Sequence, residues 1–93
     1  MVTTTSAFVV EVIDGDTFKI RSGEHVRLSD VCAPEKGQPG WDAARSRLAQ
    51  LVLHETVTLQ VVATDTYGRL VADVWVGSAH ANAAMRRYGY TCS

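Results

Sequence analysis

Several residues that could act together on a phosphate lie near the start of the chain, and one lies further on. Asp14, Asp16, Arg27 and Glu35 fall within residues 14–35, and Arg69 ends the run 65–69. Arginine offers two parallel donors to phosphate oxygens, which lysine cannot. A carboxylate can ligate a hard cation such as Ca²⁺, and a glutamate can accept a proton from an attacking water. These are the parts needed to hydrolyse a phosphodiester.

Each residue also has an ordinary structural interpretation. The run Asp14-Gly15-Asp16 is a common turn sequence. Arg27 alone is typical of a solvated strand residue, and Glu35 alone of an exposed loop acid. Tyr67, before a glycine, could be an aromatic packed in a turn. It is the joint occurrence of these residues that favours a catalytic site.

Length and charge restrict the class of protein. Ninety-three residues are enough for a single domain, 1–93, with its own core. A formal net charge of −1 argues against broad electrostatic attraction to nucleic acid. Seven of the nine cationic residues are arginine, which suits a small pocket with bidentate phosphate contacts.

The two cysteines and the hydropathy pattern bear on location. Cys32 and Cys92 are too few and too irregularly spaced to indicate a disulfide framework or a zinc site. We see no secretion signal and no apolar stretch long enough to span a membrane. We therefore expect a cytoplasmic protein with two free thiols and no membrane association. Secretion after removal of a leader is the alternative.

Periodicity predicts an α+β fold that is mainly β. Alternation of apolar and polar residues predicts five short strands, over residues 8–13, 17–21, 26–28, 56–62 and 69–76. Apolar residues at helical spacing predict helices over 41–53 and 80–88. Gly15 is expected at positive φ in a turn, and residues 33–40 are expected to form an irregular loop. This order fits a small five-stranded barrel of the oligonucleotide/oligosaccharide-binding type, with a helix after strand 3 and a short C-terminal helix.

Four segments, in this order, resemble the staphylococcal nuclease (thermonuclease) family. They are Ile13–Thr17, Val26–Leu28 with Ala33–Glu35, Asp65–Arg69, and Asn82 with Arg87–Gly89. The resemblance extends over about residues 8–91. It implies a metal-dependent nuclease that cleaves single-stranded DNA or RNA with little sequence preference.

The resemblance also implies roles for individual residues. Asp16 would bind the catalytic Ca²⁺, for which Mn²⁺ or Mg²⁺ are alternatives, and Arg27 and Arg69 would clamp the scissile phosphate. Glu35 would activate the water. Ala33 would contribute only its backbone carbonyl to the metal, where the family usually has threonine.

Two loop residues are candidates for contact with the nucleic acid. Tyr67 could stack on a base, a contact that any base allows, and Asp65 lies in the same run. The family's namesake continues into a further helix with stacking tyrosines, whereas this sequence ends at Ser93. An apolar patch left by that difference could be covered by a second copy of the chain, so a monomer and a homodimer are both open.

Cys32 departs from the family pattern, which usually has aspartate there as a second metal ligand. A thiol is a poor ligand for Ca²⁺. Asp30 would share a face with Cys32 in an extended strand and could supply a replacement carboxylate, or it could be an exposed acid at the strand end. The alternative function is therefore a nuclease-like barrel without turnover that binds nucleic acid or protein.

Overall fold

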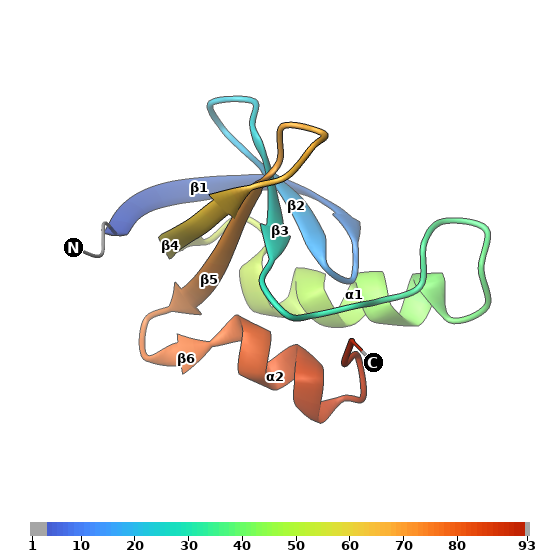
Figure 1. Ribbon diagram of the computed structural model, residues 1–93. Coiled ribbons are helices and arrows are strands. Elements are labelled where there is room, and N and C mark those ends of the chain that lie inside the picture. Colours follow the sequence, from blue (N-terminus) through green and yellow to red (C-terminus); the bar gives the residue numbers. More distant parts are fainter. Residues whose placement is uncertain (1–3, 93) are drawn as a thin grey trace.

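Six strands form one sheet that closes into a barrel in the computed structural model, which describes residues 4–92 (Figure 1). The strand order is β3-β2-β1-β4-β5-β6, and a parallel pairing of β3 with β5 closes the barrel. The strands are β1 (Thr4–Asp14), β2 (Thr17–Ile20), β3 (His25–Leu28), β4 (Thr56–Thr64), β5 (Leu70–Val76) and β6 (Ala79–His80). The helices are α1 (Trp41–Val52) and α2 (Ala81–Arg87). The expected five-stranded barrel is confirmed, and the two-residue β6 is an addition that was not predicted.

Strand β1 is longer than the alternation predicts because it has two partners. Thr4–Phe8 pairs with β4, and Val9–Asp14 pairs with β2. Register shifts after Val9 and after Val12 interrupt its pairing with β2, and such irregularities bend a strand and increase its twist. The Thr-rich start has no clear two-residue period of its own, so tertiary pairing rather than local pattern makes it a strand.

The core lies inside the barrel and beneath it, where both helices pack (Figure 1). Ala44, Leu48 and Val52 form the buried face of α1, at the four-residue spacing expected of one helix side. They join side chains from every long strand, of which Phe18, Leu28 and Leu59 are among the largest that are fully buried. On β3, the buried Val26 and Leu28 leave the intervening Arg27 outside the core, as predicted.

Gly15 is required for close packing, and the prediction that it uses positive φ is wrong. The glycines with positive φ among residues 4–92 do not include it. A Cβ atom at Gly15 would lie 2.6 Å from the Cβ of Ala44 and 2.9 Å from the Cβ of Ala33. The turn between β1 and β2 therefore touches both α1 and the loop that follows β3, and only glycine leaves enough room.

The end of α2 sends the chain back toward β3. Gly89, at φ 103, ends the helix, and its N–H donates to the Arg86 carbonyl at 2.9 Å. The Tyr90 N–H donates to the Met85 carbonyl at 3.2 Å, which completes the usual glycine-ended helix terminus. The Tyr90 carbonyl then accepts a hydrogen bond from the Cys32 N–H at 3.1 Å.

Cys32 and Cys92 form a disulfide, so the prediction of two free thiols is wrong. Their Cα atoms are 4.9 Å apart although 60 positions separate them in the sequence. Sequence spacing does not limit which distant residues the fold brings together, and this is why the pair was missed. Disulfides persist in oxidising compartments. The expected cytoplasmic location stays a prediction, and free thiols no longer support it. Within residues 4–92, no helix combines the length and apolar character needed to cross a membrane.

Candidate functional site

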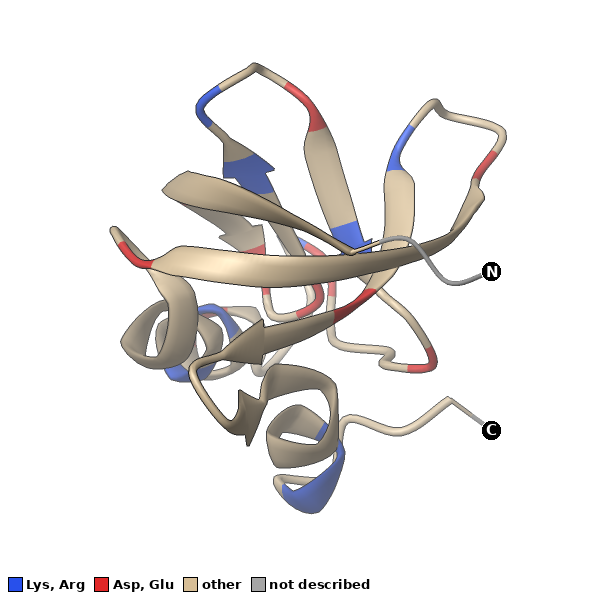
Figure 2. Ribbon diagram, turned by 90° about the vertical axis from the view of Figure 1, so that its left-hand side faces the viewer, with Lys and Arg blue, Asp and Glu red and all other residues tan. Residues whose placement is uncertain are grey.

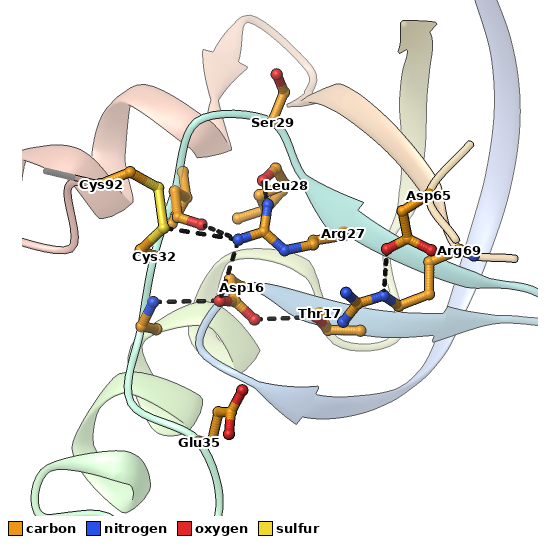
Figure 3. Close-up of polar contacts among 12 residues, drawn as sticks. Asp16, Thr17, Arg27, Leu28, Ser29, Cys32, Glu35, Asp65, Arg69 and Cys92 are labelled. Atoms are coloured by element: carbon orange, nitrogen blue, oxygen red, sulfur yellow. Dashed lines mark hydrogen bonds and ion pairs between the residues drawn. A yellow bond between two sulfur atoms is a disulfide. The ribbon is translucent and has the colours of Figure 1, made fainter. Parts of the chain in front are cut away.

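A pocket of about 360 Å³ brings most of the sequence-predicted residues together from four parts of the chain, but not Asp30, Asp65 or Tyr67. They come from the β1–β2 turn, β3, the loop 31–38 and the residue before β5 (Figure 3). The pocket is lined by Asp14, Asp16, Arg27, Cys32, Ala33, Glu35, Gln38 and Arg69. Most of these are charged or polar, so the pocket suits a charged ligand.

A larger cavity, of about 540 Å³, opens elsewhere on the barrel. Its charged lining residues are Arg21 and Glu24, and the guanidinium of Arg21 already lies 4.4 Å from the centre of the Phe8 ring. The remainder of its lining is apolar or uncharged. Because the larger cavity lacks two arginines opposite carboxylates, we assign the expected chemistry on a phosphate to the smaller pocket.

Asp16 is held at the turn between β1 and β2. Its Oδ2 accepts a hydrogen bond from the Ala33 N–H at 3.1 Å, and its Oδ1 accepts one from the Thr17 hydroxyl at 2.9 Å. The nearest guanidinium nitrogen of Arg27 is 4.0 Å from Oδ2. The side chain is 13% exposed. The carboxylate therefore faces the pocket with a fixed orientation.

Arg27 is fixed by the segment that follows β3. Its Nη1 donates to the Leu28 carbonyl at 3.3 Å, and its Nη2 donates to the Val31 carbonyl at 3.1 Å. Nη2 also donates a longer hydrogen bond to Cys32 Sγ at 3.6 Å. Carbonyls and a disulfide sulfur are uncharged acceptors, so the positive charge of Arg27 is only partly balanced, by Asp16.

Arg69 is positioned by Asp65, four residues earlier. Asp65 Oδ2 accepts from Arg69 Nε at 2.6 Å, and Oδ1 accepts from the backbone N–H groups of Tyr67 and Arg69 at 2.9 and 3.0 Å. Burial raises the pKa of Asp65, but the hydrogen bonds and charge of Arg69 and the Tyr67 N–H together outweigh it, and the pKa lies below its ordinary value. The sequence predicts that Asp65 contacts the nucleic acid. In the structure its carboxylate instead accepts hydrogen bonds from Arg69.

Tyr67 and Glu35 lie in exposed loops, and of the two only Glu35 lines the pocket. Tyr67 is 84% exposed, with the Arg69 guanidinium 5.4 Å from its ring centre. Glu35 is exposed, and its backbone N–H donates to Gln38 Oε1 at 2.8 Å. In Figure 3 the Glu35 carboxylate points toward the side of the site where Asp16 lies. A water could therefore reach Glu35 from solvent.

Two residues of the site were missed by sequence reasoning. Gln38 lines the pocket and bonds to Glu35, and Trp41 donates from Nε1 to Asp14 Oδ1 at 2.6 Å. Both lie where an irregular loop meets α1. No periodic pattern reports which way such side chains point.

The carboxylates do not form a ready calcium cage. Among residues 4–92, no three His, Cys, Asp or Glu side chains are grouped so that they could hold a metal ion. Cys32 is committed to its disulfide. Asp30 is exposed and does not line the pocket, and its left-handed backbone, at φ 58, removes the extended geometry on which its use as a replacement ligand depended. The Ala33 N–H is bound to Asp16, and the use of the Ala33 carbonyl as a ligand stays a prediction. Ca²⁺ takes six to eight oxygens, so Asp16 would supply only a small part of its coordination.

Comparison with known proteins finds a matching family and several similar sequences. Residues 25–93 match the family described as staphylococcal nuclease homologue. The protein ParB of Escherichia coli is 42% identical over 71 residues, and the micrococcal nuclease of Shigella flexneri is 40% identical over 70 residues. An uncharacterized endonuclease of Haemophilus influenzae is 33% identical over 85 residues. These matches cover 73%, 72% and 87% of this chain but only 40%, 40% and 48% of the relatives.

Proposed function

Because this chain belongs to the staphylococcal nuclease homologue family, we propose that it hydrolyses phosphodiester bonds of single-stranded DNA or RNA with little sequence preference. The observation that carries the proposal is one pocket holding Asp16, Arg27, Glu35 and Arg69 from separate parts of the chain. Two arginines and three carboxylates, Asp14 included, around one space suit a phosphate and an attacking water.

The proposed reaction uses these side chains in distinct ways. Arg27 and Arg69 bind the oxygens of the scissile phosphate and stabilise the charge that grows on them as the bond to the incoming oxygen forms. Glu35 takes a proton from the attacking water. The bond between phosphorus and the leaving oxygen then breaks, and the leaving oxygen takes a proton from water. Asp65 keeps the Arg69 guanidinium at the pocket.

The nucleic-acid partner is supported by the surface beside Arg69. The exposed Tyr67 ring could stack on a base without selecting its identity. Figure 2 shows basic and acidic residues interspersed over the barrel, in keeping with the net charge of −1. Affinity should therefore depend on a few local contacts rather than on a basic surface. Whether the chain acts as a monomer or a homodimer stays a prediction.

Dependence on a divalent cation is part of the proposal. Ca²⁺ is the expected ion, with Mn²⁺ and Mg²⁺ as alternatives, and Asp16 is the carboxylate expected to meet it. Because affinity follows the number of charged ligands, we expect weak binding.

The proposal is tested by cleavage of end-labelled single-stranded DNA in Ca²⁺, Mn²⁺, Mg²⁺ or EDTA. We expect cation-stimulated cleavage that Glu35→Gln reduces by about 10²–10⁴-fold, because the substitution removes the base but keeps the size. Glu55→Gln, which changes an exposed acid between α1 and β4, is the matched control and should leave cleavage unchanged. Equal rates for Glu35→Gln and the native chain would refute the assignment.

A binding module without turnover is the second candidate. It is favoured by the disulfide at Cys32 and by the lack, within residues 4–92, of three His, Cys, Asp or Glu side chains grouped so that they could hold a metal ion. It predicts no cleavage with any cation, together with binding of single-stranded DNA that Arg69→Ala weakens. Cation-stimulated turnover would rule it out.

A further inference from the structure

The Cys32–Cys92 disulfide lies in the wall of the pocket (Figure 3). Cys32 lines the pocket, and its sulfur is 3.6 Å from Nη2 of Arg27. Cys92 reaches it from the segment after α2, whose Tyr90 carbonyl accepts from the Cys32 N–H. One covalent bond and one backbone hydrogen bond thus tie the segment after α2 to the site.

The segment that is tied down, 31–33, contacts two charged side chains of the site, Arg27 and Asp16. The Val31 carbonyl accepts from Arg27 Nη2, and the Ala33 N–H donates to Asp16 Oδ2, each at 3.1 Å. Residues 31–33 belong to no helix or strand. Val31 is anchored by its buried side chain in the core. The position of Cys32 and Ala33 therefore depends on these contacts and on the disulfide rather than on a regular hydrogen-bond ladder.

Both cysteines are exposed, so a reductant can reach the bond. A dithiol reductant would break it by exchange. Two electrons and two protons convert the two sulfurs to thiols, and the reductant is oxidised to its own disulfide. No side chain needs to leave the core for this reaction.

We propose that Cys92 is a positioning residue for this site, and that the oxidised state holds Arg27 and Asp16 in place for the phosphate. Reduction releases Cys32 and Ala33 from the segment after α2, so the contacts of the Cys32 sulfur with Arg27 and of the Ala33 N–H with Asp16 loosen. Only the cleavage arm of the test below rests on the proposed nuclease function. The positioning itself is a property of the fold.

The structural arm measures amide hydrogen exchange by NMR in the oxidised chain, the chain reduced with dithiothreitol, and Cys92→Ser. We expect at least tenfold faster exchange at Cys32 and Ala33 in the last two samples. The Gly23 N–H, which donates to the Ile20 carbonyl at 2.9 Å in the exposed turn between β2 and β3, exchanges by local opening and serves as the internal reference, so it should keep its rate. Unchanged exchange at Ala33 would overturn the proposal. Equal acceleration at Gly23 would also overturn it, because the bond would then act only on global stability.

The cleavage arm compares kcat and KM in the same states. We expect reduction and Cys92→Ser each to raise KM at least tenfold, with a smaller change in kcat, because the loosened group is the phosphate-binding arginine. The double variant Cys32→Ser, Cys92→Ser should have the kcat and KM of the reduced chain. Dithiothreitol should change neither value. Cleavage that is indifferent to reduction would overturn the proposal. No cleavage in either redox state would refute the nuclease, while the exchange rates would still decide the positioning.

Discussion

The two arginines of the pocket are held by different partners, and this difference matters for catalysis. Arg27 is bonded to carbonyls and to a sulfur, whereas Arg69 pairs with the carboxylate of Asp65. We predict that Arg69→Ala lowers kcat/KM about 10²–10³-fold, the usual effect of removing a donor to developing charge. Arg69→Lys should recover little, because an ammonium lacks the paired donors. Single-turnover cleavage measures both.

Arg47→Ala is the control for these variants. Arg47 lies on the exposed side of α1 with its guanidinium 4.2 Å from the Tyr88 ring centre, and it does not line the pocket. The substitution removes the same positive charge as Arg69→Ala but lies outside the pocket. If Arg47→Ala lost as much activity as Arg69→Ala, net charge rather than position would be responsible.

The lowered pKa of Asp65 bears on the pH range in which this carboxylate stays paired with Arg69. A carboxyl group whose pKa is lower in the folded state contributes stability above its unfolded pKa, and that contribution is lost as pH falls through the folded value. We therefore predict that the Asp65–Arg69 pairing persists throughout neutral and mildly acidic pH and weakens only below 3.8, the ordinary value. Carboxyl carbon NMR shifts of Asp65, followed across the acidic pH range, measure this. A midpoint above 3.8 would contradict the geometry.

At the scale of elements, Asn82 connects α2 to the strands beside the site. It is fully buried; its Oδ1 accepts from the Val74 N–H at 2.8 Å, and its Nδ2 donates to the Ser29 and Ala72 carbonyls at 3.0 and 3.1 Å. We predict that Asn82→Ala lowers the free energy of unfolding by about 2–4 kcal/mol, because several buried backbone groups lose their partners. Urea denaturation measures the change. Ser46→Ala, at an exposed position of α1, should shift it by less than about 0.5 kcal/mol.

At the scale of the whole molecule, the disulfide joins two segments 60 positions apart. Closing a loop of that length reduces the entropy of the unfolded chain, which corresponds to about 4 kcal/mol in the chain-entropy relation. We predict that Cys92→Ser lowers the free energy of unfolding by about 2–4 kcal/mol and that dithiothreitol lowers it equally in the native chain. Urea denaturation with and without reductant measures both. A change below about 0.5 kcal/mol would mean that the bond does not stabilise the fold.

Much of the fold and the residue types of the site follow from the sequence alone. Alternation at β2 and β3 predicts Phe18 and Leu28 inside and Arg27 outside, and the structure confirms this. The helical spacing of Ala44, Leu48 and Val52 likewise predicts the buried face of α1. These features are local, since a two- or four-residue period directly records which side of an element is buried. The residues that could bind a phosphate were found from their chemistry and their order.

Other features were decided only by the tertiary structure. The Cys32–Cys92 bond, the approach of Ala44 to Gly15, and the placement of Asp65 on Arg69 each depend on where the folded chain brings atoms into contact. Sequence patterns report burial along one element, and they do not report distances between elements or the direction of loop side chains. That is why the free thiols and the role of Gly15 were predicted wrongly, while the barrel itself was predicted correctly.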